Sequence, residues 1–269
     1  LAGHARLLRA RRRHGMRRVV LFSGGVGSYC AAKRVAAEHG PPTLLFTDTN
    51  MEDEDLYRFL DEAAASLGAD LVKLADGRTP WDVYRDRRMI GNTQRDLCSE
   101  TLKRNLADRW LREHCDAGRT VCYVGIDWSE SHRYERMAPR KLPWVYKAPM
   151  CDAPYLTKQQ MLDELRADGI EPPRLYGMGF PHNNCGGFCV KAGQAHFLHL
   201  LKTMPERYAY HERKEQEMRD YLGKDVAILR DRRGGTTKPL TPRALRERSE
   251  AGDQLDLFDW GGCGCFAGE

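Results

Sequence analysis

Short apolar runs alternate with amphipathic stretches along the first half of the chain. Four runs have the length of a buried strand, and they are residues 18–22, 43–47, 70–74 and 120–126. The stretches between them carry apolar residues at helical spacing, which predicts helices over residues 29–39, 53–67 and 102–114. Because strands alternate with helices, the sequence predicts an α/β fold, a three-layer, doubly wound and mostly parallel sheet with helices on both faces.

The pattern changes beyond Trp144. Thr157 is a good helix N-cap, and it predicts a helix over residues 158–168. An irregular stretch rich in glycine and cysteine follows, and residues 194–218 then form a charged helical pattern. The sequence therefore predicts a helical C-terminal extension, with a mobile charged segment at 230–253. Four parts are expected: a basic arm (1–15), a main domain (16–195), a charged helical extension (196–254) and a flexible cysteine-containing tail (255–269).

The composition is that of a soluble globular protein, with 41% hydrophobic and 30% charged residues among 269. No apolar run is long enough to cross a membrane, and no secretory leader opens the chain, so we expect a cytoplasmic protein. The net charge of +5 equals the five arginines of residues 1–15. That stretch is either a functional arm or a start-site artefact, because Met16 stands just before the first strand.

Nine cysteines are many for a chain expected in the cytoplasm. A disulfide scaffold is not expected there, and metal, cluster or redox chemistry better explains those cysteines that cluster. Two groups stand out. Cys185 and Cys189 lie in a glycine-bearing stretch that begins with His182, and Cys263 and Cys265 lie in a Gly-Gly-Cys-Gly-Cys tail.

A glycine-rich turn joins the first predicted strand to its helix. Such a turn lets the backbone approach an anion closely, and the helix N-terminus presents free N–H groups to it. The turn is neither a Walker A loop nor a Gly-x-Gly-x-x-Gly loop. The candidate phosphate-binding residues are Ser23, Gly24, Gly25, Val26, Gly27 and Ser28.

Five stretches in order resemble one known family. The turn resembles the Ser-Gly-Gly-x-Asp-Ser pyrophosphate loop of the adenine nucleotide alpha-hydrolase superfamily (PP-loop ATP pyrophosphatases), which includes the phosphoadenylyl-sulfate (PAPS) reductases. The other four stretches, which together with the turn span residues 18–195, are residues 48–50, 98–104, 125–133 and 176–189. The resemblance implies an adenine nucleotide alpha-hydrolase-like fold, with Asp48 and Thr49 near the adenosine or a Mg²⁺ ion, and Gly125, Glu130 and Arg133 at the phosphates or sulfate.

Three positions depart from the family pattern. Gly27 stands where the family usually has Asp, and Asp127 stands where reductases usually have Arg. Cys185 and Cys189 are separated by three residues rather than two. Since Arg is the natural clamp for a sulfate or phosphate group, Asp127 weakens the case for a sulfated nucleotide.

The resemblance also brings Cys98 near Cys185 and Cys189. Three thiolates with an open or non-cysteine fourth position suit a [4Fe–4S] cluster, and a structural zinc site is the alternative. His182, Cys263 or Cys265 is a candidate fourth ligand. The tail cysteines are also candidate nucleophiles, because one thiolate could attack sulfur and the other could resolve the product.

Three functions remain open from the sequence. The leading one is ATP-dependent adenylation of an acceptor, such as a nucleic acid, followed by sulfur transfer. The second is reduction of adenylyl sulfate or PAPS to sulfite, with Cys263 or Cys265 as catalytic cysteine and a dithiol or electron-donor protein as partner. The third is a non-catalytic nucleotide-binding module with structural zinc. A partner subunit or a homo-oligomer is possible in each case, and no membrane partner is expected.

Overall fold

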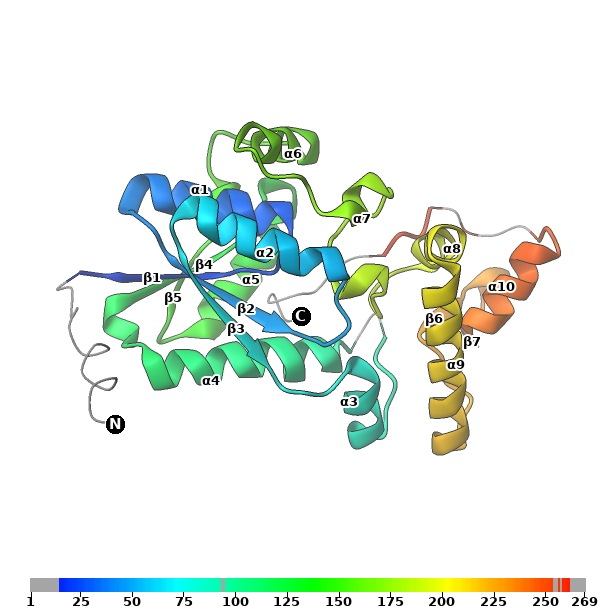
Figure 1. The fold of residues 1–269 in the computed structure, drawn as a ribbon. Helices are drawn as coiled ribbons and strands as arrows, with labels where there is room; N and C mark the ends of the chain where they lie inside the picture. The colour runs from blue at the N-terminus through cyan, green and yellow to red at the C-terminus, as the bar shows by residue number, and fades with distance from the viewer. Residues whose placement is uncertain (1–14, 93–94, 254–255, 257, 262–269) are drawn as a thin grey trace, which may run out of the picture.

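The computed structural model describes residues 15–92, 95–253, 256 and 258–261 (Figure 1). Its centre is a five-stranded sheet in the order β3-β2-β1-β4-β5, and every neighbouring pair is parallel. The strands of this sheet are β1 (Arg17–Leu21), β2 (Thr43–Asp48), β3 (Asp70–Ala75), β4 (Thr120–Val124) and β5 (Val145–Lys147). The predicted α/β class and mostly parallel sheet are therefore confirmed.

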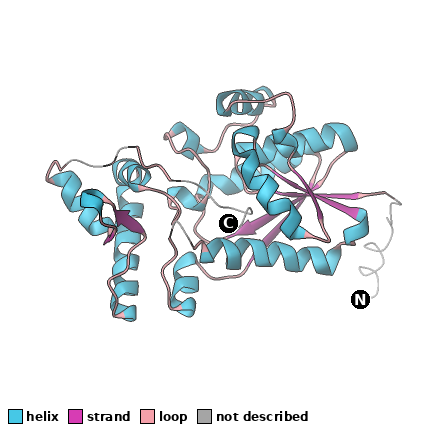
Figure 2. Ribbon diagram, turned by 180° about the vertical axis from the view of Figure 1, so that it is seen from behind, coloured by secondary structure: helices cyan, strands magenta, loops and turns pink. Residues whose placement is uncertain are grey.

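Helices cover both faces of this sheet and continue beyond it (Figures 1 and 2). They are α1 (Val26–His39), α2 (Glu54–Leu67), α3 (Pro80–Arg87), α4 (Asn105–His114), α5 (Ser131–Met137), α6 (Lys158–Ala167), α7 (Arg174–Gly177), α8 (Gln194–Thr203), α9 (Pro205–Leu222) and α10 (Pro242–Glu250). Thr157 caps α6 as predicted, since its hydroxyl accepts from Gln160 N–H in a capping box.

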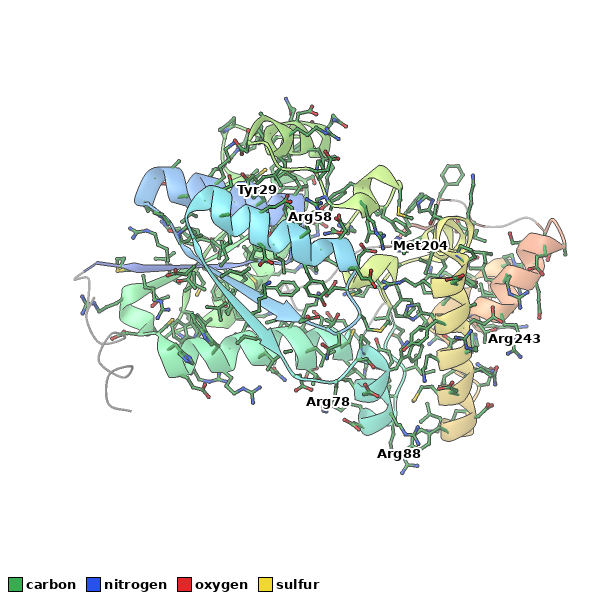
Figure 3. The ribbon with its side chains drawn as sticks, viewed as in Figure 1. Tyr29, Arg58, Arg78, Arg88, Met204 and Arg243 are labelled. Atoms are coloured by element: carbon green, nitrogen blue, oxygen red, sulfur yellow. The ribbon has the colours of Figure 1, made fainter. Side chains whose placement is uncertain are left out.

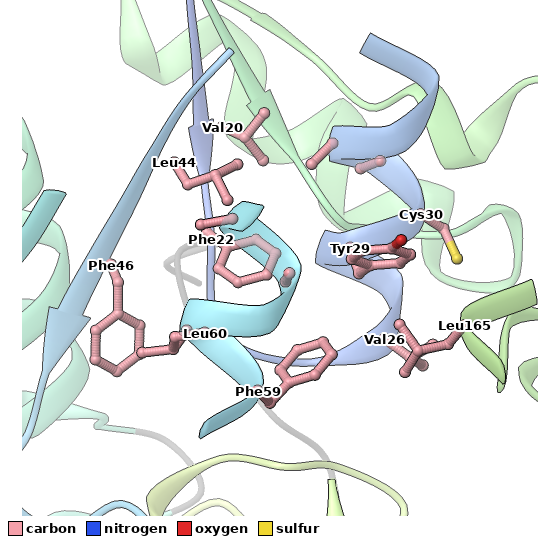
Figure 4. Close-up of a cluster of buried hydrophobic side chains, with 14 of the residues drawn as sticks. Val20, Phe22, Val26, Tyr29, Cys30, Leu44, Phe46, Phe59, Leu60 and Leu165 are labelled. Atoms are coloured by element: carbon pink, nitrogen blue, oxygen red, sulfur yellow. The ribbon is translucent and has the colours of Figure 1, made fainter. Parts of the chain in front are cut away.

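The alternation of side chains along β1 creates the layers. Val20 packs with α1, α2 and α6 on one face, whereas Val19 and Leu21 pack with α4 and α5 on the other. Figure 4 shows the first of these clusters, where Phe22, Tyr29 and Phe59 lie together beside the sheet. Two-sided burial explains why β1 and β2 read as continuous apolar runs in the sequence.

The strand order places the candidate site. The chain runs outward from β1 to β2 and β3, and then returns to the other side of β1 as β4. In such a sheet, ligands bind in the crevice at the carboxyl ends of the strands where the order reverses. Here that point lies between β1 and β4, next to the Ser23–Ser28 turn.

The C-terminal part differs from the prediction in two places. The helical stretch 194–218 is broken, because Pro205 lacks a backbone N–H and therefore begins a new helix, α9. Residues 230–253, expected to be mobile, instead form the hairpin of β6 (Leu229–Asp231) and β7 (Lys238–Leu240) and the helix α10. Leu229, Leu240 and Leu245 from these elements are buried in a cluster with α8 and α9. Among the described residues, no helix is long and apolar enough to span a membrane.

Glu215 on α9 gives a test of this packing. Burial raises the pKa of this carboxyl to about 8, although Ile228 N–H donates to its Oε2 at 3.0 Å. The folded protein therefore holds a proton that the unfolded chain releases near pH 4.5. Stability should fall as pH rises from about 4.5 to 8, by up to about 1.4 kcal/mol per pH unit for one proton.

We expect Glu215→Gln to remove this part of the pH dependence and to stabilise the protein relative to the wild type at pH 8. Urea unfolding between pH 5 and 9 measures it, with the exposed Glu217→Gln on the same helix as control. Parallel curves for the wild type and Glu215→Gln would show that Glu215 is ionised in the folded state.

Candidate phosphate site at the ends of β1 and β4

A small polar cavity of about 90 Å³ lies where the strand order reverses. We call it the phosphate cavity. Eight residues singled out from the sequence line it, and these are Ser23, Gly25, Gly27, Ser28, Gly125, Glu130, Arg133 and His182. Asp127, Lys158, Tyr176, Asn183 and Asn184 also line it. The structure therefore brings together residues from five separate segments of the chain.

The turn presents the N-terminus of α1 to the cavity. Gly25 is the N-cap, and it has no side chain that could accept from the helix N–H groups. Tyr176 takes one of the N–H groups at this helix end, because Val26 N–H donates to its hydroxyl at 3.0 Å. Ser28 Oγ donates to Gly25 O at 2.7 Å and receives a long 3.4 Å contact from Ser23 Oγ. The first N–H groups of a helix have no carbonyl partner in a preceding turn. The N-terminus of α1 can therefore donate hydrogen bonds to a bound anion.

Gly27, the position where the family has Asp, packs against the backbone of β4. A Cβ on Gly27 would lie 2.8 Å from Gly125 O, and a Cβ on Gly125 would lie 2.5 Å from Ser28 N. Both distances are shorter than ordinary contacts, so these two glycines let α1 approach the end of β4. An Asp side chain at position 27 would not fit this arrangement without a backbone shift.

Cations and carboxylates line the cavity together. Arg133 Nη1 lies 2.7 Å from Glu130 Oε2, and Lys158 Nζ donates to Pro181 O at 3.3 Å. Asp127 Oδ1 accepts from Ser129 N–H at 2.9 Å and so begins the turn that leads to α5. Two cationic and two carboxylate side chains therefore line the cavity, and their formal charges balance.

His182 is uncharged at neutral pH. Burial lowers its pKa to about 4, and the charge of Lys158 adds to this effect. The positive charge available to a ligand therefore comes from Arg133 and Lys158 rather than from this imidazole.

Asn183 joins the cysteine-bearing loop to the glycine turn. Its Nδ2 donates to Gly24 O at 2.9 Å, and its side chain is 1% exposed. Because the Gly24 carbonyl only accepts, this bond fixes the amide orientation and leaves Oδ1 without a partner among the described residues. The loop from Asn183 to Gly187 therefore closes one side of the phosphate cavity.

The same loop bends through a left-handed backbone. Cys185 has φ +52°, and Gly186 and Gly187 follow with φ +58° and +82°. A non-glycine residue in this region is uncommon and persists where its surroundings hold it. Cys185 N–H donates to Glu52, and Arg207 Nη1 donates to Gly186 O at 2.7 Å.

Glu52 is buried at the junction of three segments. Its Oε1 accepts from Thr49 Oγ1 at 2.9 Å and lies 3.3 Å from Lys103 Nζ, and both charged side chains are almost fully buried. Lys103 belongs to a π-helical turn (Ser99–Arg104) that runs into α4. Glu52 thus links the loop after β2, the start of the α4 segment and the cysteine-bearing loop.

Asp48 and Thr49 lie at the same sheet edge but do not line the phosphate cavity. Asp48 Oδ2 accepts from Tyr57 OH at 2.8 Å, and Thr49 is bound to Glu52. Their role near an adenosine or a metal ion stays a prediction. The loop that follows them lines a wider cavity of about 740 Å³, which continues to the start of α9 at Met204 (Figure 3).

The cysteines expected to hold a cluster surround a buried phenol. Tyr84 OH donates to Cys98 Sγ at 3.2 Å. Burial raises the pKa of this phenol, and Cys98, Cys189 and Cys185 lie close enough to add to the effect. Among the described residues, however, no three His, Cys, Asp or Glu side chains are grouped to hold a metal ion. These cysteines as placed do not fit a metal centre, and we derive no chemistry through one.

Cys263 and Cys265 lie outside the described residues, so their proposed roles stay predictions. The segment before them is described: Ala192 forms a β-bridge with Gly261, and Gly193 N–H donates to Trp260 O at 3.1 Å. A second small cavity, of about 80 Å³, lies beside this contact and is lined by Cys189, His182 and Trp260 among others.

Sequence reasoning missed three residues that build the site: Lys158, Asn183 and Glu52. Lys158 read only as the first residue of a capped helix, and Asn183 as part of an irregular stretch. Glu52 had no signal at all, because its importance comes from burial against segments about 50 and 130 residues away. Such tertiary contacts leave no local pattern in the sequence.

The comparisons with known proteins show a resemblance to solved structures. No family model matches the chain, and no curated protein matches it. One similar structure is PAPS reductase from Candida auris in complex with phosphate, with 14% identity, a TM-score of 0.43, and coverage of 60% of this chain and 78% of that one. Another is a predicted subunit of a tRNA methyltransferase from Methanocaldococcus jannaschii, with 18% identity, a TM-score of 0.35, and coverage of 59% and 91%.

The resemblance to PAPS reductases drawn from the motifs is thus found again among solved structures. Both TM-scores are below 0.5, so neither structure carries an argument about the chemistry of this chain. We therefore infer the function from the site itself.

The contact between Gly27 and Gly125 predicts the effect of adding one methyl group. Gly27→Ala should destabilise the protein by about 1–3 kcal/mol through overpacking, partly offset by up to about 1 kcal/mol of helix propensity. Thermal unfolding measures this change. Gly177→Ala is the matched control, because a Cβ there meets nothing within 4 Å and the backbone is not left-handed. Equal melting temperatures for the two variants would contradict the close approach of α1 and β4.

Proposed function

We propose that this chain is an enzyme that binds an adenine nucleotide with one phosphate group in the phosphate cavity. The observation that supports this most is the convergence of the N-terminus of α1, Arg133 and Lys158 on one small cavity. Backbone N–H groups together with cationic side chains are the groups that recognise phosphate. The glycine pair at positions 27 and 125 explains how the backbone comes close enough.

The size of the cavity limits what enters it. Its volume of about 90 Å³ is far below the 740 Å³ of the wider cavity beside the loop after β2. We therefore place one phosphate group in the phosphate cavity and the base and ribose outside it.

The carboxylates favour ATP with Mg²⁺ over a sulfated nucleotide. Asp127 and Glu130 both line the cavity, and they would repel a sulfate or phosphate that carries no cation. Mg²⁺ in nucleotide sites is held by one or two carboxylates together with the phosphates, and these two residues supply such donors. A bound Mg²⁺ would neutralise charge on the phosphates. This supports the ATP-dependent reading, in which ATP is cleaved between its α- and β-phosphates to adenylate an acceptor, followed by sulfur transfer.

Each residue then has a defined task. Arg133 and Lys158 bind phosphate oxygens, and Glu130 orients Arg133 through their 2.7 Å contact. Asn183 holds Gly24 and keeps the cysteine-bearing loop against the turn. Ser23 and Ser28 shape the turn and leave the N-terminus of α1 facing the ligand. The identity of the acceptor, with nucleic acid as the candidate, remains a prediction.

A reductase is the second candidate, and one observation favours it. Gly261, two positions before Cys263, is bound to Ala192, which follows the Cys185–Cys189 loop. A catalytic tail cysteine acting on adenylyl sulfate or PAPS, with a dithiol or electron donor, would be consistent with this attachment.

Turnover of ATP tests the proposal. The wild type should form AMP and pyrophosphate from ATP and Mg²⁺, with water attacking the α-phosphorus in place of the acceptor. Arg133→Gln and Lys158→Gln should each lower kcat/KM by about 10- to 150-fold, because a hydrogen bond to a charged group contributes about 1.5–3 kcal/mol. Arg112→Gln, on the exposed side of α4, is the control and should leave the rate unchanged.

Two outcomes would count against ATP chemistry. Unchanged rates in both cavity variants would mean that the phosphates bind elsewhere. Sulfite release from PAPS with a dithiol, and no turnover of ATP, would establish the reductase instead.

A further inference from the structure

Two exposed aromatic rings belong to chain segments that also line the phosphate cavity. Trp128 and Tyr155 are 45% and 60% exposed, and their ring centroids are 6.0 Å apart. Trp128 directly follows Asp127, and Tyr155 lies three residues before Lys158, so both rings adjoin residues that line the cavity. Large aromatic side chains exposed side by side are uncommon on a surface without a partner.

A hydrogen bond orients the Trp128 ring, and further bonds organise the loop that carries Tyr155. Trp128 Nε1–H donates to Leu156 O at 3.0 Å, which connects the two segments. Arg34 donates to the carbonyl oxygens of Pro149, Asp152 and Pro154, and so organises the loop that leads to Tyr155. A ring that is already oriented loses little conformational entropy when a flat ligand stacks on it.

Basic side chains continue from Arg133 along the segment that follows Trp128. Arg133, Arg136 and Arg140 follow one another at spacings of three and four residues along α5 and the 3₁₀ turn Ala138–Lys141, which places them along one side of this segment. Arg136 and Arg140 are exposed, and no ion pair links either of them to an acidic side chain among the described residues. Between residues 127 and 158 the chain carries six Lys or Arg against four acidic residues.

We propose that this surface, Trp128 and Tyr155 with Arg136 and Arg140, binds single-stranded nucleic acid. Aromatic platforms that stack bases, next to cations that contact the phosphate backbone, are how proteins bind single strands. A duplex would not present its base faces to the rings. The inference rests on the proposed function in one respect, since it places the acceptor strand at the mouth of the cavity where the nucleotide would be activated.

Fluorescence anisotropy with labelled oligonucleotides of fifteen residues tests this surface on the full chain. Single-stranded oligo(dT), single-stranded oligo(U) and a DNA duplex serve as three probes and separate DNA from RNA. Both single strands should bind more tightly than the duplex. The tighter of the two single strands shows whether the surface prefers DNA or RNA. Trp128→Ala should weaken single-strand binding by about 5- to 150-fold, since stacking contributes about 1–3 kcal/mol per base. Trp128→Phe, which keeps a ring, should retain most of the affinity.

The contribution of the two arginines to oligonucleotide binding is measured from the salt dependence of the affinity. Arg136→Gln combined with Arg140→Gln should reduce the slope of log affinity against log salt by about 1.4, which is about 0.7 for each phosphate that the protein no longer neutralises. Tyr221→Ala, an exposed aromatic on α9, and Arg112→Gln are the matched controls and should bind like the wild type.

ATP binding, followed in parallel, separates this proposal from the proposed function. Loss of oligonucleotide binding in Trp128→Ala with ATP binding intact supports the surface. The proposal is overturned if the wild type binds no single strand, if the variants of this surface bind like the controls, or if Trp128→Ala loses ATP binding while single-strand binding stays. In the last case the rings belong to the nucleotide site. Loss of ATP chemistry in the cavity variants alone would leave the surface standing.

Discussion

The buried ion pair between Glu52 and Lys103 is the contact on which the candidate site depends. Taking two charges out of water is costly, and the cost is offset only when the remaining oxygens and protons also find partners. Here Thr49 and Cys185 N–H occupy the other positions around Glu52. Removing one partner of such a pair typically costs about 3–5 kcal/mol, because the other charge is left buried and alone. The pair therefore holds three distant segments together.

The phosphate cavity follows from that junction. Glu52 fixes the backbone at Cys185, and Asn183, two residues earlier, is bound to Gly24 of the phosphate turn. A left-handed bend through Cys185, Gly186 and Gly187 makes this double attachment possible, and Arg207 from α9 holds the bend. The C-terminal helices thus support the cavity although none of their side chains lines it.

The sequence predicts the sheet well because its strands are buried on both faces. Continuous apolar runs and capped amphipathic helices are local signals, and they gave β1 to β4, α1, α2 and α6 nearly at their true bounds. The three-residue strand β5 and the short helix α3 carry too little periodicity to be read. The hairpin of β6 and β7 was hidden by its charge, since only Leu229 and Leu240 reveal its buried side.

The residues of the candidate site also fall into two groups: those that local sequence patterns predicted and those that depend on distant contacts. The glycine turn, Gly125, Glu130 and Arg133 were expected at the phosphates from motifs, and residues of the turn line one cavity with the other three. His182, expected as a metal ligand, lines the same cavity. Lys158, Asn183 and Glu52 act through contacts across more than 50 residues of chain, which no local pattern records. Gly27 and Asp127, two of the three departures from the family pattern, have physical reasons here: close backbone packing and the cap of the turn before α5.

The central claim is that a phosphate group binds between the Ser23–Ser28 turn and the end of β4. A crystal structure of the full chain with inorganic pyrophosphate tests it most directly. We expect electron density for a phosphate within hydrogen-bond distance of Arg133, Lys158 and the N-terminus of α1. Density only in the wider cavity near Arg207, with the turn free of ligand, would contradict it.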